Sequence, residues 1–280
     1  MQRIKYKYLL TVCAFSIIVF VSACGTVDEE KPSCSGVLST EGSGNNDVLV
    51  WSDEFDTDGL PCNENWTYDV GKGQGGWGNN EVQFYTRDKN AYVENGVLKI
   101  TAKKQTYSGA EYTSARIKTQ NRFSFTYGRV EVRAKLPLGG GTWPAIWMLG
   151  ENITSVGWPT CGEIDIMEHR GNFPGEPSSA IHNSSGFGDT PYVSHPPKDL
   201  SVTSEFHIYA INWTKDKIEF IKDDLIHYVY QPRFKDAANW PFNKNQFIIL
   251  NVAMGGTLGG SIDPNFTSSA MEIDYVRVYQ

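Results

Sequence analysis

Apolar and polar residues alternate along residues 129–136. The even-numbered positions from Val130 to Leu136 are apolar, whereas the odd-numbered positions from Arg129 to Lys135 are charged. Successive side chains of a β-strand point to opposite faces, so this segment predicts a strand with one face buried and the other in water.

Short segments of the same character recur between clusters of Gly, Pro, Asn and Asp, and Asp223 and Asp224 separate two of them as a hairpin turn would. No window of about a dozen residues shows the 3.6-residue period and the caps of an amphipathic helix. The pattern therefore predicts an all-β fold, a jelly-roll β-sandwich of two antiparallel sheets. Further strands are expected at residues 98–102, 208–213, 218–221, 226–230, 247–253 and 272–279.

Residues 1–24 have the character of an export signal. Basic residues precede an almost wholly apolar run at 9–21, and small residues lead from it to Cys24. A run of about 13 residues is shorter than the ~20 that a membrane-spanning helix needs, which favours a cleaved signal. The pattern resembles a bacterial lipoprotein signal, in which Cys24 is acylated; a plain secretory signal is the alternative. Residues 25–46 are polar and aperiodic and predict a tether, which leaves 47–280 as the folded domain.

The charge balance argues against nucleic acid as a partner. The 280 residues include 25 Lys and Arg against 32 Asp and Glu, a net charge of −7 that would repel phosphates. Hydrophobic residues make up 40%, enough for a sizeable core. Cys34, Cys62 and Cys161 follow Cys24 without CxxC spacing, so they allow one disulfide outside the cytoplasm but do not identify the pair.

A glycine-rich stretch at residues 71–76 satisfies the pattern GxGxxG, but the sequence after it does not open a helix. A dinucleotide site needs a strand before this motif and a helix after it. We interpret the stretch as a loop that holds Trp77, Asn79 and Asn80 toward a ligand, with a plain turn as the alternative.

The candidate chemistry is concentrated in residues 162–169, GEIDIMEH. In a regular strand Glu163 and Asp165 share one face and Glu168 lies on the other. A β-bulge at Ile166 or Met167 would return Glu168 to the first face, because a bulge counts two residues as one in the ladder. The two glutamate Cα atoms would still be ~13 Å apart along the strand, so the side chains must incline toward each other.

Three crowded carboxylates suit glycoside cleavage, for which a retaining enzyme needs carboxyl groups ~5–5.5 Å apart and an inverting enzyme ~6.5–9.5 Å. We predict the retaining spacing, with at least one carboxyl protonated near neutral pH. Glu163 would attack the anomeric carbon, Glu168 would act as acid and base, and Asp165 would orient the nucleophile. The spacing alone leaves an acidic solvated strand face or a calcium site as the alternative.

The segment from Glu163 to Glu168 resembles the ExDxxE signature of glycoside hydrolase family 16, and other stretches agree along nearly all of residues 48–280. The glycine-rich loop and the bulged acid strand look like the laminarinase branch, whose members cut β-1,3-glucans internally with retention. Mixed-linkage lichenases and xyloglucan transferases typically carry the shorter ExDxE, whereas agarases and carrageenases share ExDxxE. The matching stretches are residues 51–55, 75–86, 128–135, 143–148 and 273–279.

The resemblance implies a substrate cleft on a concave sheet, with Glu163 as nucleophile, Asp165 as its helper and Glu168 as acid/base. Tryptophans would stack on sugar faces there, and polar groups would bind sugar hydroxyls. Any of these tryptophans could instead belong to the core, Arg116 could pair with a carboxylate, and His182 could be a packed polar residue. The implied substrate-binding residues are Asn80, Arg116, Trp143, Trp147, Trp158 and His182.

The resemblance implies no cofactor for catalysis and a structural calcium ion at Glu54, Gly96 and Asp274, away from the catalytic face. The implied substrate is laminarin, with mixed-linkage β-1,3-1,4-glucan as a further candidate. A hydrolase of agarose or carrageenan and a non-catalytic glucan-binding protein are the alternatives. We expect a monomer that is exported and held at the outer membrane or cell surface by a lipid on Cys24.

Overall fold

The computed structural model describes residues 47–280. The predictions for the export signal, Cys24 and the tether therefore lie outside the described residues. Within residues 47–280, no helix combines the length and the apolar character needed to cross a bilayer.

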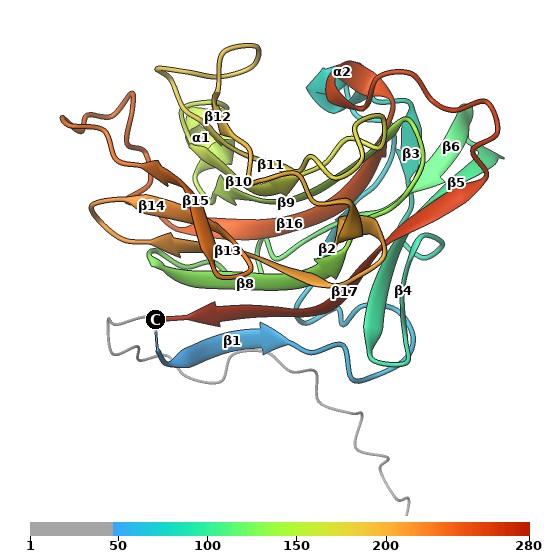
Figure 1. Cartoon of the computed structure of the whole chain (residues 1–280), viewed down its shortest axis with the longest axis horizontal. Helices are drawn as coiled ribbons and strands as arrows, with labels where there is room; N and C mark the ends of the chain where they lie inside the picture. The colour runs from blue at the N-terminus through green and yellow to red at the C-terminus, as the bar shows by residue number, and fades with distance from the viewer. Residues whose placement is uncertain (1–46) are drawn as a thin grey trace, which may run out of the picture. The chain divides into compact units, whose positions relative to one another are not determined.

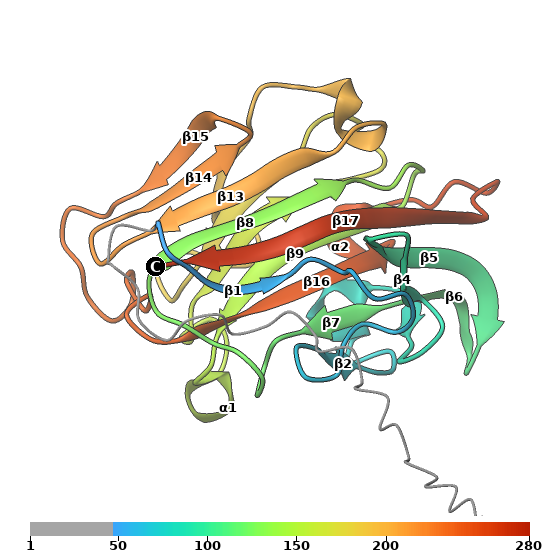
Figure 2. The same ribbon diagram turned by 90° about the horizontal axis from the view of Figure 1, so that it is seen from below.

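The larger of two sheets has ten strands. They are β1 (Leu49–Asp53), β3 (Gln83–Tyr85), β4 (Ala91–Glu94), β5 (Val97–Tyr107), β6 (Ala110–Ser114), β8 (Gly128–Lys135), β13 (His207–Trp213), β14 (Ile218–Lys222), β15 (Leu225–Tyr230) and β17 (Ser268–Tyr279). Their order is β15-β14-β13-β8-β17-β5-β6-β3, with β1 also on β17 and β4 also on β5. Figure 2 shows β1 beside β17. The pair β3–β6 is parallel, which departs from the purely antiparallel sheets that the sequence predicted.

The smaller sheet has seven strands and carries the candidate site. Its strands are β2 (Thr67–Asp69), β7 (Arg116–Lys118), β9 (Thr142–Gly150), β10 (Glu163–Glu168), β11 (Ser178–His182), β12 (Tyr192–Ser194) and β16 (Gln246–Met254). Their order is β12-β11-β10-β9-β16-β7-β2, with every pair antiparallel. The described helical segments are short: η1 (Gly76–Asn80), α1 (Ile153–Val156), η2 (Leu200–Thr203) and α2 (Gly256–Gly259).

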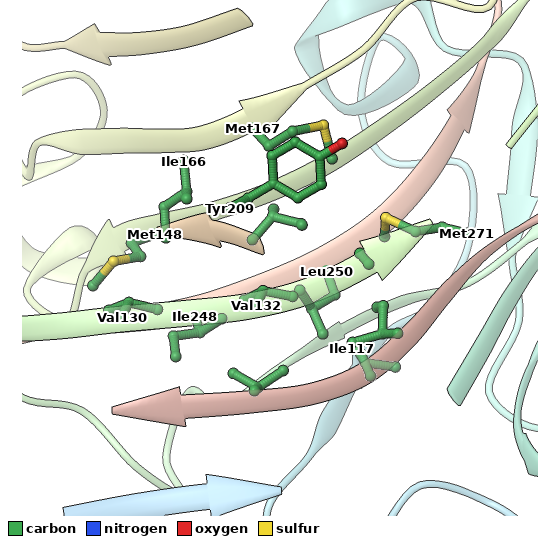
Figure 3. Close-up of a cluster of buried hydrophobic side chains, with 14 of the residues drawn as sticks. Ile117, Val130, Val132, Met148, Ile166, Met167, Tyr209, Ile248, Leu250 and Met271 are labelled. Carbon is green, nitrogen blue, oxygen red and sulfur yellow. The ribbon is translucent and has the colours of Figure 1, made fainter. Parts of the chain in front are cut away.

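The hydrophobic core lies between the two sheets. Val130 and Val132 of β8 are fully buried, as their alternation with charged neighbours predicts. They face Met148 of β9 and Ile248 and Leu250 of β16, which are also fully buried (Figure 3). The two stacked sheets confirm the predicted sandwich, and the outer face of the seven-stranded sheet is concave (Figure 1).

The cysteines resolve one question that the sequence left open. Cys62 is disulfide-bonded, whereas Cys161 is a free thiol that is fully buried. Cys161 is therefore excluded as a disulfide partner, and Cys34 lies outside the described residues.

Candidate active site

The three predicted catalytic carboxylates share one face of β10 because the strand contains a β-bulge. Across β9, Asp165 pairs with Trp147 and Met167 pairs with the next residue, Ile146, so Ile166 is an extra residue in the ladder. Ile166 and Met167 are 2% and 1% exposed, and both enter the core cluster (Figure 3). Two consecutive inward side chains return Glu168 to the outer face, which confirms the predicted bulge.

An indole N–H donates to each glutamate. Trp158 Nε1 donates to Glu163 Oε2 at 2.9 Å, and Trp143 Nε1 donates to Glu168 Oε1 at 2.9 Å. Trp158 comes from the connection before β10 and is 46% exposed, whereas Trp143 lies in β9 and is 9% exposed. An indole is only a donor, so these contacts hold carboxylate oxygens in place without neutralising their charge.

His182 of β11 lies beside the first two carboxylates, as the cross-strand partner of Glu163. Its Nε2 is 3.2 Å from Asp165 Oδ2 and 3.7 Å from Glu163 Oε1. The backbone N–H of Gly188 donates to His182 Nδ1 at 3.2 Å, which places the proton of the neutral ring on Nε2. The Nε2–H of His182, on β11, thus lies near both carboxylates.

Burial governs the protonation of the cluster. It raises the pKa of Glu163 well above the ordinary value, and the nearby Asp165 charge adds to the rise, whereas His182 opposes it. Burial also raises the pKa of Asp165 well above its ordinary value, with a further contribution from Glu168. The pKa of Glu168 is raised by burial and lowered in part by the Trp143 hydrogen bond. Because neighbouring carboxylates repel one another when all are charged, these shifts favour a shared proton in the cluster.

The donor atoms of Glu163, Asp165 and His182 lie within 4.8 Å of one another, a set that could also hold a metal ion. Calcium, the metal raised by the sequence, prefers an all-oxygen set, which the histidine does not supply. The indole donors of Trp158 and Trp143 match hydrogen-bonded carboxylates instead, which favours the catalytic interpretation.

Arg116 of β7 has an environment that the sequence did not specify. Its Nε is 3.0 Å from Asp69 Oδ2 of β2. Its guanidinium carbon lies 5.0 Å from the ring centroid of Trp77 and 4.6 Å from that of Trp147, so the cation is placed between two indoles. Arg116 therefore forms an ion pair with a carboxylate, which was the alternative to sugar binding, and it does so beside the indoles expected to contact sugar.

The other predicted binding residues differ in exposure. Trp147 is half-buried, and its Nε1 donates to Asn251 Oδ1 of β16 at 2.8 Å. Asn80 ends η1 with a φ of 58° and is exposed. Trp158, predicted as a stacking residue, offers the most exposed of the three predicted stacking indoles.

Phe187 is a neighbour of the site that the sequence reasoning missed. Its ring is 43% exposed and meets the Trp158 ring edge-on at 5.4 Å. The only local signal is its place between Gly186 and Gly188, in the loop that also supplies the N–H to His182. An exposed aromatic pair beside Glu163 suits contact with the apolar face of a sugar.

The three residues proposed for calcium lie near one gap in the larger sheet. β17 stops pairing with β5 at Ile273 and starts pairing with β1 at Val276, and Asp274 lies between them. Glu54 directly follows β1, and Gly96, with a φ of 74°, forms the turn between β4 and β5. The carboxylates already have cationic partners: Arg277 donates to Glu54 at 2.9 and 2.8 Å, and Arg133 donates to Asp274 at 2.5 Å. A calcium ion there would compete with both arginines.

The comparisons with known proteins agree with this geometry. Residues 78–277 match the family described as glycosyl hydrolases family 16. The chain belongs to this family. The β-glucanase of Rhodothermus marinus is 45% identical over 248 residues, which cover 83% of this chain and 85% of that protein.

Solved family 16 structures superpose closely on this chain. The laminarinase from Flavobacterium sp. UMI-01 has a TM-score of 0.78 at 43% identity, covering 83% of this chain and 100% of its own. The Rhodothermus marinus laminarinase has a TM-score of 0.77 at 44% identity, covering 83% and 97%. These family 16 neighbours confirm the jelly-roll fold class that the strand pattern predicted.

Proposed function

We propose that this family 16 chain is a retaining endo-β-1,3-glucanase that cleaves laminarin. The observation that carries the proposal is the bulged strand, which places Glu163 and Glu168 on either side of Asp165. Each of the two glutamates accepts a hydrogen bond from a tryptophan indole. The similarity to a β-glucanase and to laminarinases supports the substrate class. Mixed-linkage β-1,3-1,4-glucan is a further candidate substrate.

Each residue has a part in a double displacement. Glu163, ionised, attacks the anomeric carbon while Glu168 gives its proton to the departing glycosidic oxygen, and an ester to Glu163 forms. Glu168, now ionised, then takes a proton from water, whose oxygen attacks the anomeric carbon and releases the Glu163 carboxylate. Asp165 and His182 adjoin Glu163, so they orient it and adjust its charge.

The site needs no cofactor for these steps, because its carboxyl groups supply the nucleophile and the proton. A hydrolase of agarose or carrageenan would use the same steps on another sugar. A non-catalytic glucan-binding protein would have no use for three clustered carboxylates with raised pKa values, so the acid cluster favours an enzyme.

The test measures the release of reducing ends by a protein lacking residues 1–24, on laminarin, lichenan, agarose and carrageenan, beside Glu163→Gln. Activity on laminarin that the variant loses would support the proposal. Activity confined to a galactan would keep the mechanism and overturn the substrate. A folded protein that binds laminarin but releases nothing from any substrate would overturn the enzyme.

We also propose that Cys24 carries the lipid that holds the protein at the outer membrane or cell surface. Mass spectrometry of the protein from its host should detect an acylated N-terminal cysteine, and Cys24→Ala should release the protein from membranes. An unmodified mature N-terminus would contradict this anchor.

Structural calcium at Glu54, Gly96 and Asp274 is a separate proposal. Added calcium should raise the melting temperature of the wild-type protein, and Asp274→Asn should abolish that rise. The monomer prediction is tested by light scattering after size exclusion, where a mass near twice that of the chain would contradict it.

A further inference from the structure

Glu81 is a buried carboxylate that the catalytic steps do not use. It follows η1 and is 8% exposed. Its backbone forms an isolated bridge with Gly255, which directly follows β16. Gly76 packs so closely on it that a Cβ there would lie 2.4 Å from Glu81 N. The glycine-rich loop therefore packs against the Glu81 backbone, and the bridge to Gly255 connects this loop to the end of β16.

Hydrogen bonds connect Glu81 to the floor of the site. Its Oε2 accepts from Gln83 Nε2 at 2.6 Å and from the Tyr85 hydroxyl at 2.9 Å. The Tyr85 hydroxyl in turn accepts from Asn251 Nδ2 at 3.2 Å, and Asn251 Oδ1 accepts from Trp147 Nε1 at 2.8 Å. Each donor in this series of hydrogen bonds is directed toward Glu81. An ionised carboxylate can only accept hydrogen bonds, so it can terminate such a series.

The charge of Glu81 also acts on Arg116. Burial raises the pKa of Glu81, and the Arg116 charge is among the influences that lower it, so the two groups attract each other. Asp69 holds the other side of the guanidinium at 3.0 Å. Asp69 thus pairs with a guanidinium that lies against the Trp77 and Trp147 rings.

The strand register gives Arg116 a defined place relative to the catalytic strand. Glu168 pairs with Ala145, Ala145 with Asn251, and Asn251 with Arg116, so the four residues form one row across β10, β9, β16 and β7. Three strand spacings of ~4.8 Å put Arg116 about 14 Å from Glu168. A long glucan lying along this row would reach Arg116 with sugars remote from the scissile bond.

We propose that Glu81 is a positioning residue for the glucan site. It holds Trp147 through Tyr85 and Asn251, and the Tyr85 ring that it anchors packs against Trp77 at 5.7 Å, one of the two indoles beside Arg116. The inference rests on the proposed β-glucanase function. Glu81 itself is buried and acts through these groups.

The test compares Glu81→Gln, which removes the charge at constant size, with Glu111→Gln, an exposed glutamate on β6, as the matched control. For Glu81→Gln we expect KM for laminarin to rise about tenfold with kcat within about twofold, because uniform binding is lost. The control should match the wild type.

Binding can be measured without turnover in a Glu163→Gln background, by calorimetry with a β-1,3-linked glucose hexasaccharide. This measurement separates the positioning role of Glu81 from the proposed β-glucanase function. A wild-type protein that binds the hexasaccharide but does not cleave laminarin would count against the function alone. Adding Glu81→Gln should weaken binding by about tenfold, but much less when Trp147→Phe, which removes the last donor of the hydrogen-bond series, is already present, because the two residues act as a unit. Tyr85→Phe, which breaks the hydrogen-bond chain, should also weaken binding. Folded Glu81→Gln and Tyr85→Phe proteins with wild-type affinity would overturn the inference, as would a Glu81→Gln protein that loses kcat and keeps KM.

Discussion

The two indole donors allow the roles of the glutamates to be separated by pH. Trp143 donates to Glu168 and Trp158 donates to Glu163, and each hydrogen bond lowers the pKa of its glutamate. Replacing either tryptophan by phenylalanine keeps an aromatic ring and removes the donor. The pKa of the corresponding glutamate should then rise.

The two variants should move opposite limbs of the profile of kcat/KM against pH. Glu168 must be protonated to act as the acid, so Trp143→Phe extends activity to higher pH and moves the basic limb upward. Glu163 must be ionised to attack, so Trp158→Phe moves the acidic limb upward and narrows the profile. A hydrogen bond to a charged group contributes roughly 1.5–3 kcal/mol, and about 1.4 kcal/mol corresponds to one pH unit, so each limb should move by about one to two pH units.

The assay is reducing-end release from laminarin across the pH range in which the protein stays folded. Because the carboxylates are coupled, the limbs report the cluster as a whole, and the comparison between the two variants carries the assignment. Movement of the same limb in both variants, or of neither, would refute the reasoning. Exchange of the two effects would reverse the roles of Glu163 and Glu168.

Three further predictions concern the bulge, a buried histidine and the aromatic pair. Deleting Ile166 gives a regular strand that keeps Glu168 on the outer face, so reducing-end release from laminarin should persist. Deleting Ile166 and Met167 together turns Glu168 inward and should abolish that activity. Activity in the double deletion but not in the single deletion would contradict the bulge. His169 is 1% exposed and burial lowers its pKa to about 4, so between about pH 6.5 and pH 4 this residue is protonated in the unfolded chain but neutral in the native state. Stability should thus fall as pH drops from about 6.5 to about 4, by about 3 kcal/mol from this residue, and urea unfolding of His169→Gln should show a flatter pH dependence. Phe187→Ala should raise KM for laminarin severalfold while Phe187→Tyr should not, and an unchanged KM in the alanine variant would remove Phe187 from the substrate site.

The parts of the fold that the sequence predicted are those with local patterns. Alternation over residues 129–136 identified β8, and the continuous apolar run at 247–253 lies within β16, all of whose residues are buried. The bulge followed from the five-residue separation of Glu163 and Glu168, because only an extra residue returns both to one face.

The parts that the sequence missed depend on contacts between distant segments. β2 and β7 are three residues long, too short for a period to emerge, yet they bring Asp69 to Arg116. The parallel pairing of β3 with β6 has no local signature, since it joins strands that β4 and β5 separate in the chain. The orientation of His182 depends on a backbone N–H in the following loop, which residue type does not encode.

The central claim is that Glu163 forms a covalent bond to the sugar. A fluorinated β-1,3-glucoside with a good leaving group should trap that ester, and peptide mass spectrometry of the digested protein would locate it. The account predicts one glycosyl adduct, on the peptide that contains Glu163 and on that residue. An adduct on Asp165 or Glu168, or none on a protein that cleaves laminarin, would contradict it.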